Sequence, residues 1–181
     1  MGELVYLGLG GNVGDTEQLL EKVVSRLSEI LSRPRVSPIY RTSPVGGIAQ
    51  PDFLNAVMCG HFRGEPLELL ADCHALESDF GRDRRTEIRF GPRTLDIDVL
   101  LFGDRVLSSD RLTIPHPRMR ERAFVLVPLL DLDSGLHDPR SGERYADVLS
   151  RIGRAGIYFE RSAQVYSSSR RHGLQDTDGR E

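Results

Sequence analysis

The chain has 181 residues, of which 39% are hydrophobic and 28% are charged, and its formal net charge is −3. A chain of this length can bury a full core as one domain without disulfide or metal cross-links. The slight acidic excess argues against broad nucleic-acid binding, and no apolar run approaches the roughly 18 residues of a membrane span. Its N-terminus lacks a secretory signal pattern, and its two cysteines form no CxxC motif. We therefore expect a cytoplasmic monomer without nucleic-acid or membrane partners.

The apolar pattern of the first half predicts a strand, a helix, two further strands and a second helix. These elements are expected, in order, at residues 3–9, 17–31, 35–41, 53–62 and 66–80. The glycine-rich stretch 8–15 matches neither a dinucleotide fingerprint nor a Walker A loop, so we interpret it as a turn whose Asp15 or Thr16 caps the first helix. Pro38 restricts the second strand to a sheet edge or limits its pairing. Several prolines and glycines between residues 42 and 52 predict a surface loop of the kind that often carries function.

Two further segments of this half bear on function. Along the strand 53–62, alternation places Asn55 on the same face as Phe53 and Val57. The segment 81–90 is polar, lacks a period and carries arginines near its start. Because it has few apolar anchors, we expect it to be a mobile lid that a ligand orders.

The remaining residues predict short elements and a tail. Strand or extended segments are expected at 105–107, 111–117 and 157–159, and helices at 118–122, 124–130 with an interruption at Pro128, and 145–152. Residues 161–181 are too polar to order themselves, so we expect one domain over residues 1–160 followed by a disordered tail. Up to Phe102 the order β-α-β-β-α-β matches an α/β (α+β) fold, the ferredoxin-like plait, whose mostly antiparallel sheet is flanked by helices.

The segment 91–103 holds the densest chemistry and is expected to be a strand. One face should carry the apolar side chains of Leu95, Ile97, Val99 and Leu101. The opposite face then carries Asp96 and Asp98, roughly 7 Å apart along the backbone, and such carboxylates repel unless a cation such as Mg2+ satisfies both. Arg93 adds a positive charge beside them, which favours an anionic substrate such as a polyphosphate. The alternative is a solvated sheet face, where acidic pairs are common.

Four separated segments point to the same chemistry. They are Tyr40–Gly46, Gln50–Ala56, Gly91–Asp98 and Arg111–Pro117. The motifs GPRTLDIDVLLFG and LTIPHP, at their separation here, resemble the signatures of the 6-hydroxymethyl-7,8-dihydropterin pyrophosphokinase family of folate biosynthesis. The resemblance runs from Val5 to about Phe159. It implies transfer of pyrophosphate from ATP to the hydroxymethyl group of the pterin, with release of AMP.

The resemblance also implies roles for individual residues. Catalytic roles fall on Arg82, Arg93, Asp96 and Asp98, of which the two carboxylates would hold two Mg2+ ions. A pterin pocket would be lined by Thr42, Val45, Phe53, Asn55, Phe90 and Phe124. Nucleotide contacts would come from Glu77, Arg84, Arg93, Val99, Arg111, Thr113, His116 and Arg122.

Several of these residues also have ordinary interpretations. His116, between two prolines, suits a plain surface histidine, and Phe124 begins an apolar run that suits a core position. Arg84 and Arg85 compete for one phosphate contact, because this loop is one residue longer than in some members of the family.

The chain departs from the family at two positions, and two other classes share the expected fold. Gly11 replaces a serine that is usual in the family, and Phe90 stands where many members carry tryptophan. Nucleotidyl-transfer palms and RNA-binding modules also use the plait. An RNA module needs exposed aromatics on a basic sheet, whereas this sheet carries carboxylates. A palm needs a template channel, for which 181 residues leave little room.

Overall fold

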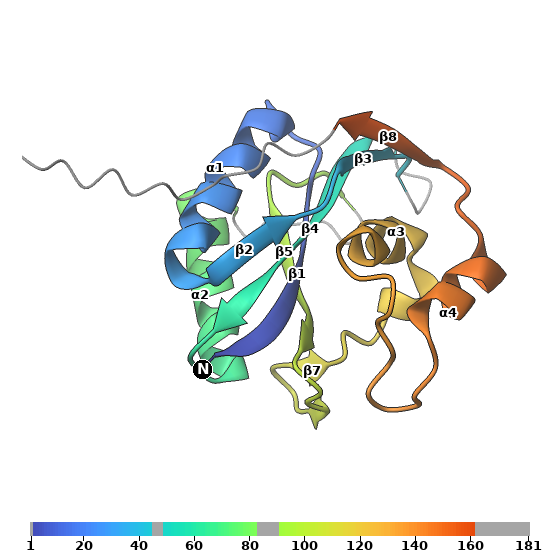
Figure 1. Ribbon diagram of the computed structural model, residues 1–181. Coiled ribbons are helices and arrows are strands. Elements are labelled where there is room, and N and C mark those ends of the chain that lie inside the picture. The colour runs from blue at the N-terminus through green and yellow to red at the C-terminus, as the bar shows by residue number, and fades with distance from the viewer. Residues whose placement is uncertain (1, 45–48, 83–90, 162–181) are drawn as a thin grey trace, which may run out of the picture.

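The computed structural model describes residues 2–44, 49–82 and 91–161, which form a central antiparallel sheet with helices on both faces (Figure 1). Helical elements are α1 (Thr16–Ile30), α2 (Pro66–Asp79), the 3-10 turn η1 (Met119–Glu121), α3 (Ala123–Leu132) and α4 (Tyr145–Ile152). Strands are β1 (Glu3–Gly11), β2 (Ser32–Val36), β3 (Ile39–Thr42), β4 (Phe53–Phe62), β5 (Asp96–Phe102), β6 (Leu107–Ser108), β7 (Thr113–Ile114) and β8 (Ile157–Arg161).

The order of the strands in the sheet is β5-β1-β4-β3-β8, with β2 also paired to β4, and every pairing is antiparallel. The first two expected strands are therefore separated in space by the later ones, as a ferredoxin-like plait requires. This confirms the predicted fold class. The strand β5, which carries the two aspartates, lies at one edge of the sheet (Figure 1).

The two helical layers enclose separate halves of the core. Figure 1 shows α1 and α2 over one face of the sheet and α3 and α4 over the other. Asp15 caps α1 as predicted, because its Oδ1 accepts from the Gln18 N–H at 3.1 Å. Pro66 opens α2, and Gly81 follows its end at a φ of 83°, the left-handed conformation that glycine tolerates best.

The expected strand 35–41 is in fact two strands, β2 and β3, that are separated at Ser37 and Pro38. Pro38 has no N–H to donate to a ladder. Ser37 bridges the gap, because its hydroxyl accepts from the Val57 N–H at 2.9 Å and donates to the Pro38 carbonyl at 2.8 Å. The proline therefore shapes this element more strongly than its apolar pattern suggested.

The predicted interruption at Pro128 is wrong, because α3 continues through it to Leu132. Buried side chains on both sides, including Leu126 and Leu129, pack against the sheet and compensate for the lost hydrogen bond. The segment expected as a helix at 118–122 forms only the 3-10 turn η1.

The prediction that Leu101 shares a face with Val99 is also wrong. In the β1–β5 register, Tyr6 faces Leu101 while Leu7 faces Val99, so Leu100 is an extra residue in β5. This bulge turns Leu101 toward the side of the sheet that holds Leu100 and α3. Asp96 and Asp98 precede the bulge and keep the alternation that the sequence predicted.

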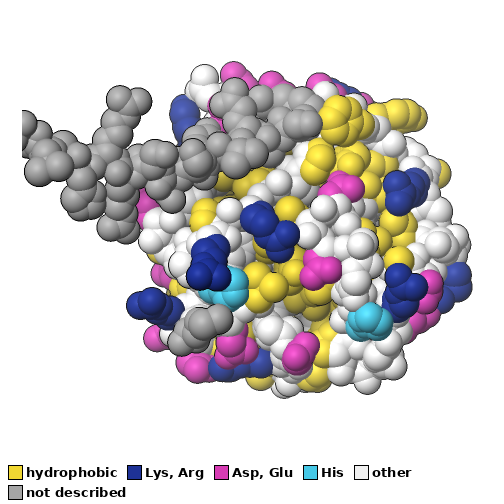
Figure 2. All heavy atoms as spheres, viewed as in Figure 1, with side chains coloured by type: hydrophobic (Ala, Val, Ile, Leu, Met, Phe, Trp, Pro, Cys, Tyr) yellow, Lys and Arg dark blue, Asp and Glu magenta, His cyan; other side chains and the backbone are white. Residues whose placement is uncertain are grey.

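Two expected segments extend beyond the described residues. The expected lid extends beyond Arg82 into residues 83–90, and the expected tail beyond Arg161 into 162–181; both of these stretches lie outside the described residues. Arg161 itself, the first residue of that tail, belongs to β8. Within the described ranges, no helix has the length and apolar character needed to cross a membrane. Figure 2 shows acidic, basic and hydrophobic side chains interspersed on the face drawn.

Candidate active site

Two glycines of β1 form the floor of the site. In the sheet register Gly8 faces Asp98 and Gly10 faces Asp96, while the other side of Gly10 faces Asn55 of β4. Because glycine has no side chain, the sheet is left bare between the aspartates and the amide. A Cβ atom at Gly10 would lie 2.8 Å from Asn55 Oδ1, so a larger residue there would displace the amide.

Above this floor lies a cavity of about 350 Å3. Its walls include Thr42, Phe53, Asn55 and Phe124, all expected in a pterin pocket, and also Arg93, Asp96, Asp98 and Arg122. The Asn55 Nδ2 donates to the Thr42 hydroxyl at 2.7 Å, and both residues are buried. This bond fixes the amide so that its oxygen remains an acceptor at the cavity.

Two arginines lie over the aromatic walls. The Arg93 guanidinium is 5.5 Å from the centroid of the Phe53 ring, and that of Arg122 is 5.6 Å from the Phe124 ring. Such cation–π contacts hold positive charge beside apolar surface. The cavity therefore joins flat hydrophobic walls to a cationic rim.

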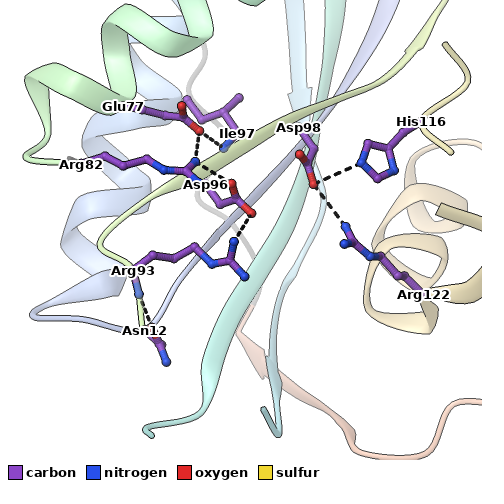
Figure 3. A network of polar contacts seen from close by, with 9 residues as sticks. All are labelled: Asn12, Glu77, Arg82, Arg93, Asp96, Ile97, Asp98, His116 and Arg122. Atoms are coloured by element: carbon purple, nitrogen blue, oxygen red, sulfur yellow. Dashed lines mark hydrogen bonds and ion pairs between the residues drawn. The ribbon is translucent and has the colours of Figure 1, made fainter. Parts of the chain in front are cut away.

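Each aspartate of β5 is contacted by cationic or imidazole side chains from outside the strand (Figure 3). Asp96 accepts from Arg82 Nη1 at 2.6 Å and from Arg93 Nη1 at 3.0 Å. Asp98 accepts from Arg122 Nη1 at 3.3 Å and lies 3.8 Å from the Nε2 of His116. These side chains balance the charge of the two carboxylates.

Burial and the nearby Asp98 carboxylate act in opposite directions on the pKa of His116. Burial lowers the pKa of its imidazole, and Asp98 opposes that shift only in part. The backbone N–H of Arg118 donates to its Nδ1 at 3.3 Å, which places the remaining proton on Nε2, toward Asp98. Burial likewise lowers the pKa of the Arg122 guanidinium. His116 therefore belongs to the site, where it lines the second cavity beside Asp98, and is not a plain surface histidine.

Glu77 lies beneath the site at the free edge of β5. Its side chain is 1% exposed, and its Oε1 accepts from the Ile97 N–H at 2.8 Å and from Arg82. Because β5 is an edge strand, that N–H has no strand neighbour on this side. Glu77 and Arg82 line neither cavity described here, and they reach the site through Asp96.

Asn12 ties the site together and was not singled out from the sequence. Its Oδ1 accepts from the Arg93 N–H at 2.9 Å, and its Nδ2 donates to Gln50 Oε1 at 3.0 Å and to the Pro51 carbonyl at 2.9 Å. Beside it, a Cβ at Gly11 would lie 2.3 Å from the Thr94 carbonyl oxygen. Gly11, where the family usually has a serine, thus allows the backbone of β1 to approach the backbone at Thr94 closely.

A second cavity of about 290 Å3 lies beyond the aspartates. Four residues expected to contact a nucleotide line it: Val99, Arg111, Thr113 and His116. Asp98 belongs to the walls of both cavities. The residues expected to bind the pterin and those expected to bind the nucleotide therefore line cavities that share the Asp98 side chain.

Some expected residues cannot be placed, and some that line the cavities were missed. Val45, Arg84, Arg85 and Phe90 lie outside the described residues. The missed residues include the polar side chains of Ser43, Arg118 and Glu121 in the first cavity and of His74, Ser109 and Asp110 in the second. Arg118 and Glu121 follow the PHP motif by one and four residues, so proximity to His116 was the available signal.

The donor set suits a hard cation. Among the described residues there is no cluster of three or more His, Cys, Asp or Glu side chains placed to hold a metal. Mg2+ is usually held by only one or two carboxylates, with substrate phosphates and water as its other ligands. Asp96 and Asp98 provide two such carboxylates at the cavity walls, so the residues present fit this ion.

The fold is a ferredoxin-like plait whose site combines paired carboxylates with arginines, and comparison with known proteins specifies the family. A family model described as 7,8-dihydro-6-hydroxymethylpterin-pyrophosphokinase (HPPK) matches residues 6–134. The 2-amino-4-hydroxy-6-hydroxymethyldihydropteridine pyrophosphokinase of Bacillus subtilis (strain 168) is 41% identical over 134 residues, covering 73% of this chain and 79% of that protein. The protein of the same name from Pseudomonas aeruginosa is 39% identical over 156 residues, covering 84% and 94%.

The chain belongs to the 7,8-dihydro-6-hydroxymethylpterin-pyrophosphokinase family. This confirms the resemblance drawn from the motifs, and the family is one of ATP-using pyrophosphokinases of folate biosynthesis, a class that generally needs Mg2+. Among solved structures, wild-type Plasmodium falciparum HPPK-DHPS matches with a TM-score of 0.62 at 14% identity, which supports the fold alone. The match covers 83% of this chain and 41% of that longer one.

Proposed function

We propose that this chain transfers pyrophosphate from ATP to the hydroxymethyl group of 6-hydroxymethyl-7,8-dihydropterin, with Asp98 at the point of transfer. The observation that carries the proposal is that Asp98 lines both cavities. One cavity has aromatic walls and a buried amide that suit a flat heterocycle, and the other holds the residues expected at a nucleotide. Substrates in the two cavities meet where the carboxylates and the cations are concentrated.

The transfer itself is a displacement at the β-phosphorus of ATP. The hydroxymethyl oxygen forms a bond to that phosphorus while the bond from it to the oxygen shared with the α-phosphorus breaks. AMP leaves with that oxygen, the pterin carries the diphosphate, and the hydroxyl proton is released. The charge that develops on the transferred group calls for fixed cations already in place.

Arginines on both sides of β5 supply that charge. Arg82 and Arg93 converge on Asp96, whereas Arg122 converges on Asp98 (Figure 3). Guanidinium groups bind phosphate oxygens through paired N–H donors, so Arg93 and Arg122, which line the first cavity, can exchange a carboxylate contact for a phosphate contact, while Arg82 holds Asp96 from beneath. His116 contributes its imidazole on the nucleotide side.

Asp96 and Asp98 would hold Mg2+, and we assign them two ions. When bound, such ions neutralise phosphate charge and polarise the phosphorus toward attack. The chain contributes the two acceptor oxygens on one strand face, the bare glycine floor beside them and the arginines that set their orientation.

The nucleotide product tests the proposal. Incubation of the protein with ATP, Mg2+ and 6-hydroxymethyl-7,8-dihydropterin should release AMP, because attack at the β-phosphorus leaves the α-phosphate on the nucleoside. Chromatographic separation of the nucleotides distinguishes AMP from ADP. ADP as the main product would indicate transfer of a single phosphoryl group and would refute a pyrophosphokinase.

The pterin half of the site should respond separately from the nucleotide half. Asn55→Ala removes the amide that Thr42 orients, and Phe53→Ala removes one aromatic wall, so each should raise the Kd for the pterin by about tenfold or more. The Kd for a nonhydrolysable ATP analogue should change by no more than about twofold. Isothermal titration of each ligand measures both values.

Thr42→Ser serves as the matched control, because it keeps the hydroxyl that accepts from Asn55. It should bind the pterin nearly as the unaltered protein does, whereas Thr42→Val should lose part of that affinity. If Asn55→Ala weakened the binding of both ligands equally, the assignment of β4 to the pterin half of the site would be wrong.

The remaining expectations concern partners and location. We propose that the chain acts in the cytoplasm on these two small substrates, without nucleic-acid or membrane partners, on the grounds of its composition and charge. We also propose that it acts as a monomer. Light scattering during gel filtration tests the monomer, and a mass twice that of the 20.3 kDa chain would refute it.

A further inference from the structure

The segment between β7 and α3 carries two side chains of the site but little regular structure. His116 and Arg122 both reach Asp98 from this segment, at 3.8 and 3.3 Å. The regular element within this segment is the three-residue 3-10 turn η1. Met119 is fully buried and anchors the middle of the segment. The positions of the two flanking residues therefore depend on contacts from elsewhere in the fold.

Asp138 provides such contacts from the connection between α3 and α4. Its side chain is 1% exposed, and its Oδ2 accepts from Arg120 Nη1 at 3.2 Å. Its Oδ1 accepts from the Arg140 N–H at 2.8 Å and lies 3.6 Å from the Arg140 Nε. The same Arg140 donates through Nη2 to the Pro115 carbonyl oxygen at 3.2 Å.

One buried carboxylate is thus linked to both ends of the segment. Pro115 immediately precedes His116, and Arg120 lies two residues before Arg122. Asp138 lines neither cavity, so any effect on the reaction must pass through its two arginines. Arg120 also pairs with Glu143, so loss of the Asp138 carboxylate leaves Arg120 one acidic partner and removes the one that it shares with Arg140. Both guanidinium groups are about one-third exposed, so solvent screens part of these contacts.

We propose that Asp138 is a positioning residue, which holds His116 and Arg122 beside Asp98 through Arg140 and Arg120. The proposal rests on the proposed function, because His116 and Arg122 matter there as contacts of the nucleotide. The pterin contacts Thr42 and Asn55 lie instead on β3 and β4 and are held by their own hydrogen bond. Arg122 lines the first cavity as well, whereas His116 lines only the second of the two. Loss of Asp138 therefore weakens the nucleotide more than the pterin.

Asp138→Asn tests this, because it preserves shape and removes the charge. Isothermal titration with α,β-methylene-ATP and Mg2+ should show a Kd about tenfold higher, as supporting residues behind binding groups commonly give. The Kd for 6-hydroxymethylpterin should stay within about threefold. Arg140→Ala, which removes the side-chain contacts with Asp138 and Pro115 but leaves Arg120 in place, should weaken the nucleotide by about threefold. Arg26→Gln is the control, because Arg26 is exposed on α1, on the other face of the sheet (Figure 1), and pairs with Glu29.

The outcomes separate a positioning role from a structural one. If Asp138→Asn and Arg140→Ala lower the melting temperature but bind both ligands normally, the positioning role is refuted. Equal weakening of both ligands refutes it as well. Should Asp138→Asn fail to fold, Arg140→Ala decides alone, since Arg140 is 37% exposed and its loss leaves the core intact. Failure of the proposed function shows separately, as an unaltered protein that releases no AMP.

Discussion

Replacing Asp98 with asparagine should lower the rate of AMP release by about a thousandfold or more while the protein stays folded. The substitution keeps the size of the side chain but removes the charge that holds a cation and balances Arg122. Asp98 also lies on the wall between the two cavities, so no other described side chain is placed to substitute for it in both. Asp96→Asn should have a comparable effect on the rate, through Arg82 and Arg93.

The fold should tolerate both changes. Asp98 is about one-third exposed and Asp96 about one-quarter, so solvent screens much of their interaction with the arginines. We expect each variant to lose about 1 kcal/mol or less of unfolding free energy. Steady-state kinetics at saturating Mg2+, with thermal unfolding on the same samples, separates the two effects.

Asp104→Asn is the matched control, since Asp104 is exposed and follows the same strand by two residues. It should retain the full rate and the full stability. A rate near that of the unaltered protein in both Asp96→Asn and Asp98→Asn would mean that the acidic pair is only a solvated sheet face, the alternative that the sequence left open.

Local alternation was sufficient to predict one part of this site. Asp96 and Asp98 share a face because side chains two residues apart on a strand always do, and the motif supplied both residues within one element. The same reasoning failed for Leu101, three residues farther along. Its position depends on a bulge at Leu100, which is a property of the pairing between β5 and β1 and leaves no mark in the β5 pattern.

Contacts between distant segments could not be predicted in this way. The bare floor at Gly8 and Gly10 exists because the register sets each glycine opposite an aspartate of β5. From the sequence these glycines indicated only a strand and a turn. Likewise, Asn12 reaches Arg93 across 81 residues of chain, and nothing in the glycine-rich stretch specified that partner. Pairing register and loop packing are long-range properties that the order of residue types does not contain.

The contact of Glu77 with β5 also could not be predicted from local sequence. It leads to the second prediction with a large expected effect, a loss of stability. The resemblance implied a nucleotide contact, whereas the structure places its carboxylate beneath β5, 1% exposed, with Arg82 and the Ile97 N–H as partners. Glu77→Ala should therefore lower the free energy of unfolding by about 3 kcal/mol, because it breaks a buried ion pair and leaves an edge N–H unsatisfied. Urea unfolding of the purified variant measures this.

Two companion variants separate the charge from the hydrogen bond. Glu77→Gln keeps an oxygen that can accept from Ile97, and Arg82 retains Asp96, so its loss should be clearly smaller than that of Glu77→Ala. Asp79→Ala, at the exposed last residue of the same helix, should stay within about 0.5 kcal/mol of the unaltered protein.

Stability and nucleotide affinity together decide between the two interpretations of Glu77. A side chain that supports β5 from below acts on the nucleotide only by way of Arg82 and Asp96, so Glu77→Ala should lose stability whether or not ATP is present. A side chain that contacts the nucleotide directly would leave the empty protein as stable as before and would weaken only the ATP analogue. An unchanged free energy of unfolding in Glu77→Ala, together with a raised Kd for the analogue, would refute the supporting role. A destabilised protein in the absence of ATP would instead show that Glu77 supports β5, and through Arg82 the position of Asp96.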